Sequence, residues 1–124
     1  MLHHFPPGST AVAVEDYDAP YPDPIAVRAG DTVIPDHERT RETDFMGWTW
    51  CRGPHGREGW TPNAWIHRTQ HARTMRRDFD ARELSARRGD RFTLILSESG
   101  FILVTNAATN QTGWLPDAVL QAER

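Results

Sequence analysis

The residues that could do chemistry in this chain are a single cysteine, six histidines and a closely spaced set of tryptophans and prolines. No serine, histidine and acid are grouped in a nucleophile motif, and no glycine-rich loop opens a helix, so nothing in the pattern indicates an enzyme. His3 and His4 are adjacent, but the spacing predicts no further converging ligands, so we expect no metal and no cofactor. Cys51 has no partner for a disulfide and is expected to be a small core residue.

The aromatic and proline residues offer a different chemistry, that of recognition. The stretch "GREGWTPNAWI", residues 56–66, sets Trp60, Pro62 and Trp65 close together. Flat aromatic rings beside a proline either pack in a turn or form the rim of a binding groove. A second stretch, "TGWLPDAVL", repeats most of this pattern near the end of the chain.

Composition limits the class of protein. The chain has 124 residues, 38% of them hydrophobic, with a net charge of −3, which is typical of a globular protein. No apolar run is long enough to cross a membrane, and we expect a cytoplasmic location. All 14 basic residues are arginine, which indicates a bacterial genome of high GC content. Residues 1–67 hold ten acids and five arginines, net −5, and residues 68–124 hold seven and nine, net +2, which disfavours one nucleic-acid-binding face.

An internal repeat divides the chain. Three blocks recur in the same order: "EDYDA" as "RDFDA", "IAVRAGD" as "LSARRGD", and "GWTPNAWI" as "GWLPDAVL". The spacing changes only between blocks, as expected when loops differ on a common scaffold. We therefore predict a flexible tail at 1–10, a first domain at 11–67 and a second domain at 72–121, packed together through a short linker.

Each copy is predicted to consist of short strands. The runs "TAVAVE", "MGWTWCR", "DRFTLIL" and "GFILVTN" are rich in alternating or β-branched residues and are separated by dense turn signals. The alternation places Trp48 and Trp50 on one face. Pro62 and Pro116 each precede a segment suited to one 3₁₀ turn. The sequence thus predicts an all-β protein made of two small barrels.

These blocks resemble two tandem Src-homology-3 (SH3) domains of the bacterial variant type. The family's first strand, Ala-Leu-Tyr-Asp-Tyr, is similar to "AVEDY"; its diverging turn is similar to "IAVRAGD"; and its closing Gly-aromatic-x-Pro-x-x-Tyr-Val is similar to "GWTPNAWI". The resemblance covers nearly the whole chain. It implies a five-stranded, partly open barrel in each copy, and a non-catalytic module that binds proline-rich or extended peptides in an aromatic groove.

Carried over position by position, the resemblance implies a groove in the first domain. Its aromatic and proline floor would be formed by Tyr17, Trp48, Pro62 and Trp65, with Trp60 near the edge. An acidic rim for a basic ligand residue would be formed by Asp18, Asp23, Glu42 and Asp44. Glu15 replaces the first groove tyrosine of the family, and Ala64 replaces its groove asparagine.

The second copy departs further from the family. Arg77, Phe79, Phe101 and Val119 stand at groove positions, so this copy is expected to be a partner or support for the first. Two alternatives to peptide binding remain. In an architectural protein or homodimer, the aromatic residues would be buried in an interface, whereas peptide binding requires Trp48 and Trp65 to be exposed. A regulator that binds nucleic acid would need its arginines on one face.

Overall fold

The computed structural model describes residues 5–42 and 46–123, and the chain is mostly β, as predicted. Twelve strands, one short α-helix and two 3₁₀ turns occur in the described residues. In chain order they are β1 (Thr10–Ala13), β2 (Ala26–Val27), β3 (Ile34–Pro35), α1 (His37–Arg41), β4 (Trp48–Arg52), β5 (Glu58–Pro62), η1 (Asn63–Trp65), β6 (Ile66–Arg68), β7 (Arg73–Met75), β8 (Phe79–Asp80), β9 (Arg91–Glu98), β10 (Phe101–Asn106), β11 (Thr112–Pro116), η2 (Asp117–Val119) and β12 (Leu120–Ala122).

The chain forms two compact units that do not follow the boundaries predicted from the repeat. Unit 1 consists of Met1–Pro20 together with Glu83–Arg124, and unit 2 is the continuous segment Tyr21–Arg82. Each unit therefore contains residues of both sequence copies. Unit 2 is inserted into unit 1, directly after the segment that holds the first strand of the chain.

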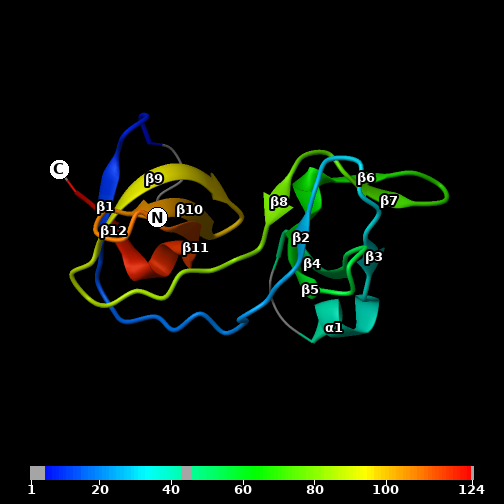
Figure 1. Cartoon of the computed structure of the whole chain (residues 1–124), viewed down its shortest axis with the longest axis horizontal. Helices are drawn as coiled ribbons and strands as arrows, with labels where there is room; N and C mark the ends of the chain where they lie inside the picture. The colour runs from blue at the N-terminus through cyan, green and yellow to red at the C-terminus, as the bar shows by residue number, and fades with distance from the viewer. Residues whose placement is uncertain (1–4, 43–45, 124) are drawn as a thin grey trace. The chain divides into compact units, whose positions relative to one another are not determined.

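Unit 1 is built on one antiparallel sheet in the order β11-β10-β9-β1-β12. Strand β1, from the first copy, lies between β9 and β12 of the second copy, as Figure 1 shows. Its core combines the two inward-facing alanines of β1 with the apolar residues of the second copy, since alternate residues of a strand face the same side. The buried cluster contains Ala11, Ala13, Leu84, Ala86, Phe92, Leu94, Ile102, Val104, Leu115, Val119 and Leu120.

Unit 2 holds a three-stranded antiparallel sheet, β3-β4-β5, and two two-stranded ribbons, β2-β8 and β6-β7. In both ribbons one strand comes from the first copy and the other from the second, and β2 and β8 lie side by side in Figure 1. Unit 2 buries more aromatic residues than unit 1. Its buried apolar residues are Ile25, Val27, Val33, Trp48, Trp50, Cys51, Trp65, Met75 and Phe79.

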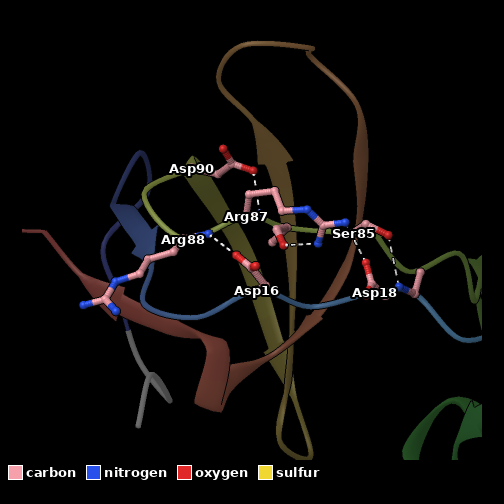
Figure 2. Close-up of polar contacts among 8 residues, drawn as sticks. Asp16, Asp18, Ser85, Arg87, Arg88 and Asp90 are labelled. Atoms are coloured by element: carbon pink, nitrogen blue, oxygen red, sulfur yellow. Dashed lines mark hydrogen bonds and ion pairs between the residues drawn. The ribbon is translucent and has the colours of Figure 1, made fainter.

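The first strand of each predicted copy, β1 or β7, thus pairs with strands of the other copy, an arrangement that we call the strand exchange, and matching hydrogen bonds hold both strands. In unit 1 the Oδ1 atom of Asp16 accepts from the backbone N–H of Arg88 at 2.8 Å, as Figure 2 shows. In unit 2 the repeat-related Asp78 accepts from the N–H of Ala29 at 2.9 Å. The exchange is therefore reciprocal, because Asp16 and Asp78, at equivalent positions, each cap the diverging turn of the other copy.

Backbone bonds at the same turns are duplicated as well. The N–H of Gly89 donates to Ala13 in unit 1, and the N–H of Gly30 donates to Met75 in unit 2. Both glycines have positive φ angles, 96° and 88°, which L side chains rarely adopt. Both glycines therefore shape the diverging turns and bond to the first strand of the other copy.

Several local predictions are confirmed, and one differs. The predicted 3₁₀ turns follow Pro62 and Pro116, each of which is the extended residue before the turn. The described part of the predicted flexible tail is structured instead, because Phe5 packs against the core of unit 1 and the N–H of Ser9 donates to Pro6. An apolar ring on a core is more favourable than the same ring in water.

Candidate functional site

Three of the predicted groove residues are brought together in unit 2. In the β4-β5 hairpin Trp48 lies directly opposite Pro62, and η1 follows at once and presents Trp65. The hairpin register and the short turn after a proline place these side chains on the same part of the unit. Trp48 and Pro62 are thus cross-strand neighbours, and Trp65 follows three residues after Pro62.

The exposure predicted for these residues is not found. Trp48 is only 5% exposed and Trp65 is 8% exposed, and Pro62 is fully buried. For Trp65 the cause is visible in its neighbours. The ring of Phe79 meets it edge to face at 5.4 Å between centroids, and the Cζ atom of Arg77 lies 4.0 Å above the indole.

Tyr17, the fourth predicted floor residue, is not in this unit. The first-strand exchange places it in unit 1, where it pairs with Ala86 and its hydroxyl donates to the carboxylate of Glu83. Its place beside Trp65 is taken by Phe79, the repeat-related residue of the second copy. The sequence alone could not show this, because both copies carry the same first-strand pattern.

The Tyr17–Glu83 contact contains a partly buried carboxyl group of unit 1 whose pKa is shifted. Burial raises the pKa of Glu83 above its usual value, and the hydrogen bond from Tyr17 opposes part of that rise. Desolvation disfavours the charged form of a carboxyl group, and burial therefore raises its pKa. No signal in the sequence indicated Glu83, whereas its partner Tyr17 was predicted as a groove residue.

Trp60, predicted at the groove edge, belongs to a second aromatic cluster in unit 2. The ring of Trp50 meets both Trp60 and Tyr21 edge to face, each at 5.3 Å. The guanidinium of Arg39 lies 3.8 Å above Trp50, and the indole N–H of Trp50 donates to Glu58 at 3.0 Å. Trp50 is consequently 4% exposed, and both its ring and its indole N–H have partners within the unit.

The described residues of the predicted acidic rim are divided between the two units. Asp18 lies in unit 1 and forms an exposed ion pair with Arg87 at 2.8 Å, drawn in Figure 2. Asp23 lies in unit 2 and pairs with Arg57 at 2.8 Å, also at the surface. Each carboxylate is thus neutralised by an arginine of its own unit. Glu42 ends α1 and is exposed, and Asp44 lies outside the described residues.

Cys51 and the possible metal ligands offer no reactive group where the structure describes them. Cys51 is fully buried, and burial raises the pKa of its thiol to about 11, although a hydrogen bond with Thr61 lowers it somewhat. A thiol in this environment is protonated and inert near neutral pH. Among residues 5–42 and 46–123 no cluster of three His, Cys, Asp or Glu side chains could hold a metal ion.

An open cleft of about 580 Å³ lies along the β2-β8 ribbon of unit 2. Acids from both copies line it, but Asp31 and Asp78 already accept backbone N–H groups, and so does Asp80 at its end. These carboxylates act as turn caps. The cleft lies between strands of the two copies, and its lining combines these acids with Arg28 and Arg57.

Comparison with known proteins finds one family similarity. The family model of the variant SH3 domain matches residues 10–67, so this stretch is similar to a variant SH3 domain, and the all-β structure is SH3-like. The match does not extend to the second copy. SH3 domains are generally non-catalytic interaction modules that bind proline-rich peptides, and no enzyme family is indicated.

A comparison with curated proteins gives no match to the chain. Within the described residues, no helix has the length and apolar character needed to cross a membrane. The stretch matched by the family, residues 10–67, is itself divided between the two units, because Thr10–Pro20 lies in unit 1.

Proposed function

We propose that the chain is a protein-interaction module whose unit 2 binds an extended, proline-containing segment of a partner. The observation that supports this most is the assembly of Trp48, Pro62 and Trp65 on neighbouring elements of one unit. Phe79 completes the set from the second copy, in the place that the resemblance gave to Tyr17. Flat rings beside a proline suit a ligand that is already extended and loses little entropy on binding.

The burial of Trp48 and Trp65 sets a condition on this function. A ligand can reach the indoles only after the side chains over them have moved. The side chain of Arg77 can move off Trp65, because it lies on the surface and its aliphatic stem can adopt other rotamers. The side chain of Phe79 cannot move off Trp65, because it is 4% exposed and belongs to the core.

The test is a titration of isotope-labelled protein with proline-rich peptides, followed through the five indole N–H signals. Peptide binding predicts saturable shifts at Trp48 and Trp65, with an ordinary micromolar affinity of about −8 kcal/mol. Trp114 lies in unit 1 and is an internal reference that should not move. Trp48→Ala should abolish the shift at Trp65 while the spectrum of unit 1 stays unchanged.

The architectural function is the second candidate, and the same burial favours it. If the aromatic residues of unit 2 serve only packing, no peptide will shift their indoles, and Trp48→Ala will lower stability without changing any binding. If they form a homodimer interface, dilution will shift them instead, and sedimentation will show a mass that depends on concentration.

Binding of nucleic acid has less support from the charges. Arg87 and Arg91 are paired with Asp18 and Glu123 in unit 1. Arg73, Arg76 and Arg77 lie in the other unit, so the basic residues do not form one patch within a unit.

A further inference from the structure

The surroundings of Trp65 are basic, although the family resemblance led us to expect an acidic rim. Arg77 stacks on the indole face at 4.0 Å. The backbone N–H of Arg76 donates to the carbonyl of Trp65 at 2.8 Å, and its guanidinium Nε donates to the carbonyl of Ile66 at 3.4 Å. Two consecutive arginines of the second copy therefore border the tryptophan of the first.

The nearby acids do not neutralise this pair. In the bend between β7 and β8, Arg77 contacts Trp65, as does Phe79 at the start of β8, whereas Asp78 between them accepts the backbone N–H of Ala29. The guanidinium of Arg77 has the indole ring as its contact and has no carboxylate partner in the described part of the chain.

We propose that unit 2 selects an extended segment in which an acidic residue stands beside proline, with Arg77 as the residue that sets this preference. The inference rests on the peptide-binding function proposed above. In the free protein the guanidinium covers Trp65. A carboxylate on the ligand draws the guanidinium away, because a bidentate, charge-assisted pair offsets the loss of stacking on the indole. The uncovered indole then receives the proline.

This assignment gives Arg77 two opposite effects. It competes with any ligand for the face of Trp65, and it attracts a ligand that brings its own carboxylate. A basic ligand meets only competition and repulsion. The expected order of affinity is therefore an acidic peptide first, a neutral one second and a basic one last.

The experiment uses the full chain and three peptides that are identical except for Glu, Gln or Arg beside a central proline pair. Binding is followed at the indole signals of Trp48 and Trp65. For the wild type we expect about 2- to 5-fold between successive peptides at low ionic strength, the range of one exposed ion pair. The difference should shrink as salt is added, because exposed charges are screened.

Variants of Arg77 separate its two effects. Arg77→Ala should bring the three affinities close together and should improve binding of the Gln peptide about 2- to 5-fold, because Trp65 is then uncovered. Arg77→Glu should reverse the order and favour the Arg peptide. Arg39→Ala is the matched control: it removes the same charge from the face of Trp50, and the order should stay that of the wild type.

Each result decides between the two proposals. If no peptide shifts Trp48 or Trp65, the peptide-binding function itself is wrong, and the preference fails with it. If peptides bind but the Arg peptide is preferred, or if Arg77→Ala keeps the wild-type order, only the role given to Arg77 is overturned. A wild-type preference for Glu that is lost in Arg77→Ala and reversed in Arg77→Glu supports it.

Discussion

Replacement of Phe79 by alanine gives the sharpest test of the strand exchange. In the structure Phe79 is 4% exposed and its ring packs on Trp65, a residue of the other copy. Truncating a buried phenylalanine to alanine costs about 3–5 kcal/mol. Unit 2 spans Tyr21–Arg82 and, at roughly 0.05–0.15 kcal/mol per residue, has a stability on the order of 3–9 kcal/mol. We therefore expect Phe79→Ala to unfold unit 2 partly or wholly.

The tryptophans show which unit has been affected. Unit 2 contains Trp48, Trp50, Trp60 and Trp65, and unit 1 contains only Trp114. Phe79→Ala should broaden or shift the four indole signals of unit 2 and should speed amide hydrogen exchange in β4 and β5. The matched variant at the repeat-related position, Tyr17→Ala, should instead perturb Trp114 and the amides of β9 and β10.

The opposite pattern would refute the exchange. If each copy kept its own first strand, Phe79 would belong with Trp114 and Tyr17 with Trp65. Phe79→Ala would then loosen β9 and β10, and Tyr17→Ala would disturb Trp65. Because the two arrangements predict opposite assignments for the same pair of variants, a general loss of stability cannot be mistaken for either one.

Three other substitutions or reagents test individual sites. The pKa of Glu83 is raised because burial favours the protonated carboxyl group in the folded state. Its contribution to the stability of unit 1 is therefore greatest below about pH 4.5 and falls as the pH rises through the raised pKa. Glu83→Gln should remove this pH dependence of the urea midpoint. Cys51, with a pKa of about 11, should react with a thiol reagent at pH 8 about 100-fold more slowly than in the unfolded chain, and a fast reaction would contradict its burial. Gly59→Ala should destabilise unit 2 by about 1–3 kcal/mol, because its added Cβ would lie 2.9 Å from Ile25 Cγ2 and 3.1 Å from the Ile25 nitrogen; an unchanged urea midpoint would contradict this close approach.

The sequence predicted the elements of the fold well, because each depends on local signals. Alternation in "GWTWCR" predicted β4, and Pro62 and Pro116 predicted the two 3₁₀ turns. The repeat also showed which residues are equivalent. These features follow from the side-chain period of a strand and the fixed φ angle of proline, and both can be recognised within a few residues.

The partner of each first strand could not be predicted in this way. In the exchanged arrangement Asp16 and Asp78 cap the diverging turns, and Gly30 and Gly89 bond to the first strands. If each copy kept its own first strand, the equivalent residues would offer the same bonds. Equivalent copies thus offer two pairings with nearly identical local chemistry. For the same reason the acidic rim was predicted as one group, although Asp18 and Asp23 lie in different units.

The exchange changes what the departures of the second copy mean. Taken alone, a copy with Arg77 and Phe79 at groove positions resembles a domain that has lost its function. In unit 2, however, these two residues contact Trp65, so the second copy supplies neighbours for a tryptophan of the first. A tyrosine at position 77 would enlarge an aromatic groove, whereas an arginine adds a charge that can both cover the ring and recognise a carboxylate. The altered residues of the second copy are therefore the ones to vary when the specificity of the first is measured.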